Sequence, residues 1–281
     1  MRRASTCLAL LGCLAALGLL PAAASAAPTV TFKAKAVPIP KNPSGGGGNW
    51  PHTGLISPKK GGLGAAVETN YVISGSGYGA SAAKPQGGIP PLAGVNFYLP
   101  TGAKVNSAAF TKCSESALKN SGPSGCPKSS VASPIGEAEG EVSFGAERVP
   151  EKATLQGFFA NNGLLFYVQG SSPVSLEFVS TGQFVNYNKE GYGLEFKALV
   201  PAIATVPGAP LASTHTINIK VGAAIKKGKK LISYGTLPKT CPKGGYPIKS
   251  ELIFGGSYGG EREFGIPAET VTVTYKSPCP K

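Results

Sequence analysis

Short stretches of alternating apolar and polar residues recur along most of this chain. Val174, Leu176 and Phe178 alternate with Ser175 and Glu177, and the segment 194–200 repeats the pattern. Side chains of a β-strand point to opposite faces in turn, so each stretch predicts a strand with one apolar and one polar face. Similar patterns predict further strands at 29–37, 65–74, 95–99, 155–160, 164–168, 216–221, 231–234, 247–254 and 270–275.

Residues that favour turns separate these stretches. Asn161-Asn162-Gly163 lies between two apolar runs, and Asn and Gly tolerate the positive φ of a tight hairpin. Gly170-Ser171-Ser172-Pro173 and Asn188-Lys189-Glu190-Gly191 mark the next two turns. One helix is predicted over 114–120, with a serine as its cap. The pattern predicts an all-β fold, an antiparallel β-sandwich or jelly roll with one short helix.

The first residues predict an export signal. The basic start Met1-Arg2-Arg3 precedes an apolar run from Cys7 to Leu20, and Ala24-Ser25-Ala26 has the small residues of a signal-peptidase site. We therefore expect a signal peptide at 1–26 and a secreted or extracellular, cell-surface-associated protein. A lipoprotein signal at Cys13 is the alternative. No later segment has the apolar length of a membrane span.

The remaining chain divides by composition into two parts. Residues 27–62 hold one strand and a Gly/Pro-rich loop, and residues 63–281 hold the predicted β-sandwich domain. A division of that domain near Pro150 is the alternative to a single unit. Trp50, in the N-terminal loop, either closes one end of the core or is exposed and stacks on a sugar ring.

Lysine dominates the charge. After residue 26, 25 lysines and arginines stand against 14 glutamates, and aspartate is absent. A lysine-rich surface attracts polyanions without geometric specificity. Arginines and interleaved aromatic residues, which recognise nucleic acids, are scarce. We therefore expect anionic cell-envelope polymers or glycans as partners, and no nucleic acid.

One cluster of positive charge is the candidate binding site. Lys226, Lys227, Lys229 and Lys230 surround Gly228 at a predicted hairpin tip. Four ammonium groups at a tip cannot be buried, so they face solvent. They either blunt a sheet edge and keep the protein soluble or form a docking point for anionic envelope polymers.

Four cysteines follow the predicted signal peptide: Cys113, Cys126, Cys241 and Cys279. An even number in an oxidising compartment predicts two disulfides. Three pairings are open, and we favour the nearest neighbours, Cys113–Cys126 and Cys241–Cys279. No C-x-x-C pair is present and neither histidine is near a cysteine in sequence, so we expect no metal and no cofactor.

Candidate catalytic residues are few, because without aspartate no Ser-His-Asp triad can form. Glu137, Glu139 and Glu141 lie on one face of a predicted strand. They resemble the E-x-D-x-E strand of family 16 glycoside hydrolases, which are jelly rolls with a retaining mechanism. That resemblance implies Glu137 as nucleophile and Glu141 as acid/base.

The glutamate strand also departs from the hydrolase pattern. The central aspartate is replaced by Glu139, and a flat strand holds residues i and i+4 about 13 Å apart, whereas retaining carboxyl groups approach to about 5 Å. The alternative is an exposed acidic strand face, with Ala138, Gly140 and Val142 turned inward.

Several longer stretches together resemble one group of proteins. The first set comprises 96–102, Phe110 with Cys113, 126–130 and 135–136; the second comprises 221–230 and 241–245. In them the chain is similar to a group of uncharacterised secreted β-rich proteins from high-GC bacteria. The resemblance implies export, disulfides and a β fold. Because that group has no known activity, no functional residue is carried over.

These observations favour an exported, non-catalytic β-sandwich protein that associates with the cell surface or with anionic envelope polymers. A jelly-roll glycoside hydrolase that uses Glu137 and Glu141 is one alternative. A structural secreted domain without a ligand is the other.

Overall fold

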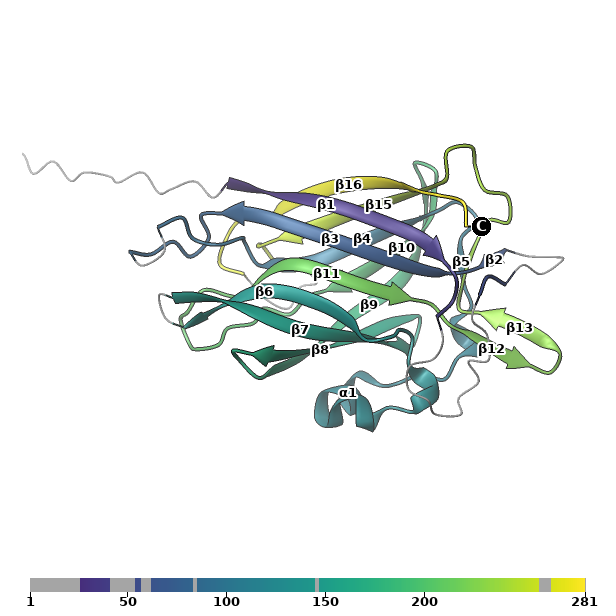
Figure 1. The fold of residues 1–281 in the computed structure, drawn as a ribbon, viewed down its shortest axis with the longest axis horizontal. Coiled ribbons are helices and arrows are strands. Elements are labelled where there is room, and N and C mark those ends of the chain that lie inside the picture. Colours follow the sequence, from purple (N-terminus) through teal and green to yellow (C-terminus); the bar gives the residue numbers. More distant parts are fainter. Residues whose placement is uncertain are drawn as a thin grey trace, which may run out of the picture.

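The computed structural model describes residues 26–40, 54–56, 62–82, 85–144, 147–257 and 264–280. The predicted signal peptide up to residue 25 and Trp50 lie outside these residues. Eleven strands of the described chain form one antiparallel sheet (Figure 1). In pairing order they are β1 (Ala26–Val37), β3 (Ala66–Ser76), β11 (Ser213–Val221), β6 (Gly136–Phe144), β7 (Glu147–Ala160), β8 (Gly163–Ser172), β9 (Leu176–Lys189), β10 (Tyr192–Leu199), β4 (Leu92–Pro100), β15 (Tyr246–Phe254) and β16 (Glu269–Ser277).

Two of the three predicted turns contain the positive φ angles expected of them, whereas residues 170–172 of the third, predicted at 170–173, belong to β8. Asn162 has a φ of 55° between β7 and β8, where Ala160 pairs with Gly163. Asn188 near the end of β9, and Glu190 and Gly191 in the turn to β10, all have positive φ. Because these angles suit Asn and Gly, local sequence is sufficient to set the central hairpins.

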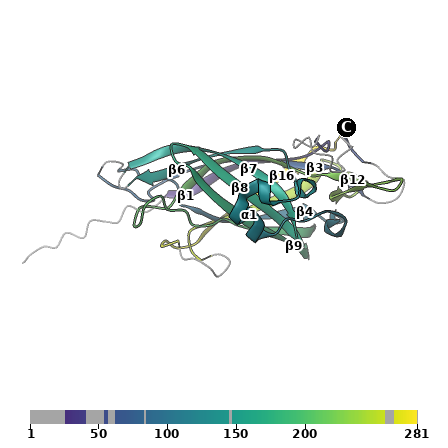
Figure 2. The ribbon, with the colours of Figure 1, turned by 90° about the horizontal axis from the view of Figure 1, so that it is seen from below.

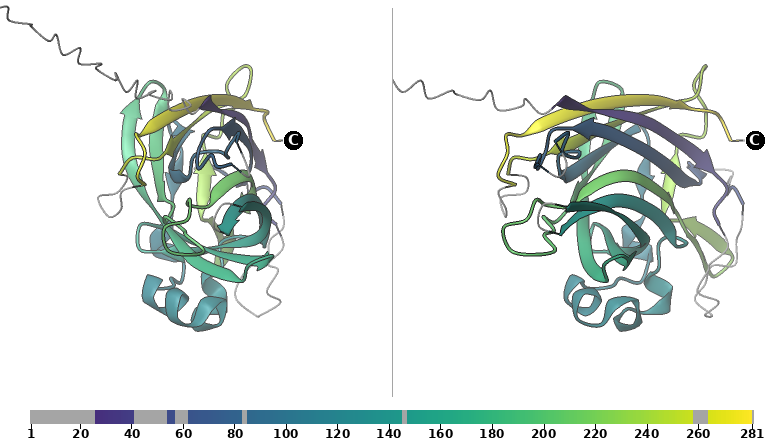
Figure 3. Two further views of the ribbon diagram at one scale, coloured as in Figure 1. Left: turned by 90° about the vertical axis from the view of Figure 1, so that its left-hand side faces the viewer. Right: turned by 60° about the vertical axis from the view of Figure 1, so that its left-hand side comes forward.

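The sheet curls until its edge strands, β1 and β16, face each other (Figure 3). The Ala36 amide donates to Ser277 Oγ at 2.9 Å, and the rings of Phe32 and Tyr275 lie 6.4 Å apart. Because the number of antiparallel strands is odd, the two edge strands run in the same direction, and they do not pair as a further antiparallel ladder. The result is a nearly closed sheet whose opposite walls face one another, and the predicted all-β antiparallel class is confirmed.

One half of the enclosed space is filled by a conventional core. Inward side chains of β1 and β3, including Phe32, Tyr71 and Ile73, pack against Ile248, Leu252 and Phe254 of β15. In the nearly closed sheet β15 is separated from β1 only by β16, so these side chains converge where the two edges of the sheet meet.

Smaller elements lie at one end of the curled sheet. A three-stranded sheet pairs β2 (Leu63–Gly64), β14 (Gly235–Leu237) and β5 (Lys104–Val105), and a hairpin is formed by β12 (Ala224–Lys227) and β13 (Lys230–Ser233). The hairpin projects beyond the end of the sheet (Figure 1).

The predicted helix is confirmed as α1 (Glu115–Ser121). Ser114 caps it, because its Oγ accepts a hydrogen bond from the Ala117 amide at 3.2 Å. The helix packs outside the sheet (Figure 2), where Leu118 is fully buried against Leu165 and Tyr167 of β8. Short 3₁₀ turns lie at 107–109, 122–125 and 128–130.

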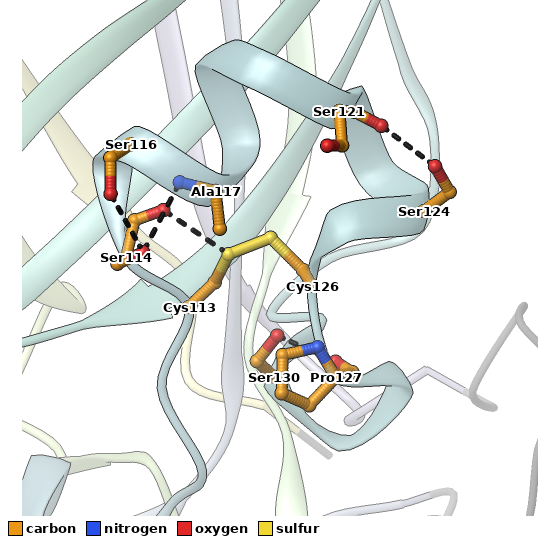
Figure 4. Close-up of a disulfide and its surroundings, with 9 residues drawn as sticks. All are labelled: Cys113, Ser114, Ser116, Ala117, Ser121, Ser124, Cys126, Pro127 and Ser130. Carbon is orange, nitrogen blue, oxygen red and sulfur yellow. Dashed lines mark hydrogen bonds between the residues drawn. A yellow bond between two sulfur atoms is a disulfide. The ribbon is translucent and has the colours of Figure 1, made fainter.

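Both predicted disulfides are present. Cys113–Cys126 brackets α1 (Figure 4), and the Cys113 amide also donates to the Phe159 carbonyl at 2.8 Å, so the bridge holds the helix against β7. Cys241–Cys279 joins the segment after β14 to the residues after β16. No helix in the described part of the chain has the length and apolar character needed to cross a membrane.

Candidate binding site in the interior of the sheet

The other half of the curled sheet encloses a cavity of about 240 Å³. Its walls are inward side chains at alternate strand positions, as the period of two requires. They include Leu164, Phe166 and Val168 of β8, Phe178 and Phe184 of β9, Val95 and Phe97 of β4, and Ile217 and Ile219 of β11. Phe178 and Phe184 are six residues apart, so this wall extends about 20 Å along β9 and the cavity is long and narrow.

The sheet is too wide for its side chains to fill. About eight strands enclose an interior that side chains can just fill, and eleven enclose more. Small inward residues, Ala138, Ser180 and Ala198, add to the unfilled space. Gly182 of β9 is also required, because Phe196 lies against the position that any side chain there would occupy.

Most hydroxyl groups in the lining are hydrogen-bonded within the protein. Tyr71 OH and Ser250 Oγ share a hydrogen bond of 3.0 Å, and Tyr234 OH donates to the Gly163 carbonyl at 3.0 Å. Ser180 Oγ donates to the Leu199 carbonyl. The lining contains no Lys, Arg, His or Glu among the described residues. An occupant would therefore be held by apolar contact rather than by ionic or strong polar groups.

The cavity lining stays uncharged at neutral pH, because its two buried tyrosines keep their protons. Burial raises the pKa of the Tyr71 phenol and of the Tyr234 phenol well above the usual range. Both remain protonated and uncharged at neutral pH.

An empty space of this size is energetically significant. The side chains that line it have no packing partners on one side and therefore forfeit part of their van der Waals contact. An engineered apolar cavity of about 150 Å³ stays dry and binds benzene. The interior is thus suited to an apolar guest that restores the missing contacts.

An end cluster of Phe110, Phe159 and Tyr234 lies beside the β12–β13 hairpin, and Tyr234 also lines the cavity. The ring centroids of Phe159 and Tyr234 lie 4.4 Å apart. Ile225 and Ile232 pair across the hairpin and pack against this cluster. The hairpin is therefore anchored at its base and exposed at its tip.

The structure places the four predicted binding lysines on that tip. Lys226, Lys227, Lys229 and Lys230 are all exposed. Lys227 pairs with Lys230 across the turn, and Gly228 has a φ of 61°. Glycine at the first central position is the feature of a type II′ hairpin turn, so sequence alone accounts for this loop.

A second lysine-lined feature lies on the outer face of β1, β3, β11 and β6. It is a polar pocket of about 530 Å³ with Lys33, Lys35 and Lys220 in its wall, beside Asn70 and Asn218. Lys220 pairs with Glu68 at 3.4 Å. The sequence gives no sign of this pocket, because its lysines come from two strands, β1 and β11, that are far apart along the chain.

The two candidate catalytic glutamates lie in different surroundings on β6. Glu137 is exposed, whereas the Glu141 side chain is only 13% exposed. The strand pairs with β7 in unbroken register, so the four-residue separation holds their backbones about 13 Å apart. The structure therefore does not bring these two carboxylates together.

Glu141 instead binds a buried arginine. Arg148 Nε donates to Glu141 Oε2 at 3.1 Å, and the Arg148 side chain is 1% exposed. Its Nη2 donates to Ser213 Oγ, and the guanidinium lies 5.5 Å from the centre of the Tyr78 ring. His215 Nε2 lies 3.8 Å from the same carboxylate. The sequence offered one sign of this buried pair, because arginine is rare in a chain whose other basic residues are mostly lysine.

Sequence reasoning also missed the interior cavity. One signal was present: β8 carries five consecutive apolar residues, 164–168, where a half-exposed strand would alternate. One face of β8 lines the cavity and the other packs against α1, so neither face needs polar residues.

Within the described residues, no three histidine, cysteine or glutamate side chains are grouped as metal ligands. Comparisons with protein-family models, curated protein sequences and solved structures find no match to this chain.

Proposed function

We propose that this protein is an exported, non-catalytic binding protein that holds a linear apolar chain inside its curled sheet. The observation that carries the proposal is the long, narrow cavity with its apolar walls and internally bonded hydroxyls. Binding sites for small molecules are concave and mostly apolar, and they are largely formed before the ligand arrives. The absence of charged groups from the described lining favours binding over acid–base chemistry.

The test is a fluorescence titration with N-phenylnaphthylamine, followed by displacement with monolaurin. We expect saturable binding, and a Val95→Phe variant should weaken it at least about tenfold, which is about 1.4 kcal/mol. Val95 lines the cavity and pairs with the small Ala198 on the neighbouring strand β10. The added ring therefore extends into the space that the ligand would occupy. A ligand present at about a hundred times its Kd should also stabilise the fold by about 2.7 kcal/mol.

Val185→Phe is the matched control. Val185 is on β9 but outside the cavity lining and 36% exposed, so the same change should leave binding unaltered. Equal binding by both variants, or no saturable binding by the parent protein, would contradict a ligand site in the interior.

A second candidate function is association with anionic envelope polymers, and the exposed lysine tip supports it. A variant with Lys226, Lys227, Lys229 and Lys230 all changed to glutamine should lose most of its sedimentation with purified cell walls at low salt. In the parent protein the binding should fall steeply with salt, since the Debye length shrinks from about 10 Å at 0.1 M to about 3 Å at 1 M.

The polar pocket supplies the comparison for this experiment. A variant with Lys33 and Lys35 changed to glutamine removes two exposed charges from the outer face and leaves the hairpin intact. Loss of sedimentation in this variant alone would place the polymer contact in the pocket. Equal sedimentation of the hairpin variant and the parent would reduce the hairpin lysines to a solubility role.

A further inference from the structure

Apart from the gap between its edge strands, the sheet also opens at one end of the β9–β10 pair. These strands pair from Tyr192 and Lys189 as far as Leu199 and Thr181. Beyond that point β9 continues to Leu176 and pairs with β8. On the other side, the Val200 amide donates to the Ala93 carbonyl at 2.9 Å, so the chain after β10 continues its pairing with β4 but no longer pairs with β9. A seam therefore separates residues 176–179 from residues 200–203.

An outer pocket of about 320 Å³ lies over this seam. It is lined by residues on both sides of the opening, including Thr181, Leu199 and Ile203. Phe178 and Val200 line this pocket and also the interior cavity. Both are half-buried. The two spaces thus meet at these two side chains.

The outer pocket differs from the interior because it has a polar wall. Glu115 and Lys119 of α1 and Glu177 of β9 contribute to it. Lys119 is paired with Glu115 at 2.5 Å, and Glu177 accepts a hydrogen bond from Gln169 at 3.0 Å. The glutamates outnumber the lysine, so an anionic group there would meet like charge.

The pKa of a tyrosine in the same pocket also depends on Glu177. Burial, with a contribution from the Glu177 carboxylate, raises the pKa of Tyr167 to about 12. Tyr167, which also lines the outer pocket, therefore keeps its proton at neutral pH. The polar wall offers carboxylate acceptors to a group that donates hydrogen bonds.

We propose that the seam is the entrance for a single-chain amphiphile, whose apolar chain occupies the interior cavity and whose head group occupies the outer pocket. The head group is non-anionic and donates hydrogen bonds, as a hydroxyl-bearing head does. This inference rests on the proposed function, because it needs an apolar chain in the interior, and it adds the head-group class and the route of entry.

The first test compares two ligands with the same chain, monolaurin and lauric acid, at neutral pH. The parent protein should bind monolaurin at least about tenfold more tightly, because the ionised laurate carboxylate faces Glu177 and Glu115. Glu177→Gln should reduce this preference. Glu137→Gln, which removes an exposed carboxylate from the distant β6 strand, should preserve it.

The second test measures the rates of monolaurin binding. Val200→Trp places a larger side chain at the opening, so association should slow about tenfold or more. The association rate is the readout rather than Kd, because Val200 also lines the interior cavity and the added ring takes ligand space there. Val185→Trp, on the exposed outer part of β9, should leave the association rate unchanged.

The outcomes separate the two levels of the proposal. If neither ligand binds, the proposed function fails. If both bind but laurate binds as tightly as monolaurin, the head-group assignment is wrong. If both bind and Val200→Trp leaves the association rate unchanged, the ligand enters by another route.

Discussion

Replacing Glu141 with glutamine is expected to destabilise the protein by about 3 kcal/mol or more, because it leaves the buried Arg148 guanidinium without its counter-charge. The cost is large because Arg148 is almost fully removed from solvent, and water cannot replace the lost carboxylate. The measurement is the free energy of unfolding from urea denaturation followed by circular dichroism.

Glu137→Gln is the control for this prediction, since it makes the same chemical change four residues earlier on the same strand. Glu137 is exposed, so the free energy of unfolding should change by less than about 0.5 kcal/mol. Equal unfolding free energies for the two variants would show that the Arg148–Glu141 pair contributes nothing to stability.

Replacing Phe159 with alanine should cost about 3 to 5 kcal/mol, the range for removing a fully buried aromatic side chain. Phe159 lies in the end cluster, with its ring centroid 4.7 Å from that of Phe110 and 4.4 Å from that of Tyr234. Its removal leaves a cavity between the sheet and the base of the β12–β13 hairpin. Thermal and urea unfolding would both report the loss.

Phe144 provides the matched comparison, because it is the same residue type at a position that is 44% exposed. Phe144→Ala should change the free energy of unfolding by less than about 0.5 kcal/mol. A small effect at Phe159 as well would mean that the end cluster can collapse around the missing ring, and that it does not hold this end of the cavity rigid.

Much of the local structure follows from local sequence. The alternation of apolar and polar residues marks the central strands, and Asn162 and Gly228 occupy turns that need a positive φ. Ser114 caps α1 as its residue type predicts. The pairing of cysteines nearest in sequence also proved correct. Each of these depends on residues that are close along the chain or on a short chain closure.

The order of the strands could not be read in the same way. β11 lies between β3 and β6, and β4 lies between β10 and β15, so both join segments that are distant in sequence. The alternation of apolar and polar residues shows which side chains share a face of a strand, but it does not show which strands pair with each other. That choice depends on the burial of the whole set of apolar faces at once.

The candidate sites show the same division. Sequence alone determined that this chain forms antiparallel strands, that four lysines crowd one hairpin tip, and that two disulfides are available. Only the tertiary structure decided that Val168 and Phe178 face an unfilled space while Phe32 and Leu252 belong to one packed core, because packing depends on the distance between the walls of the sheet. It likewise decided that Glu141 is buried and Glu137 exposed, since Arg148 reaches only one of two otherwise similar positions on β6.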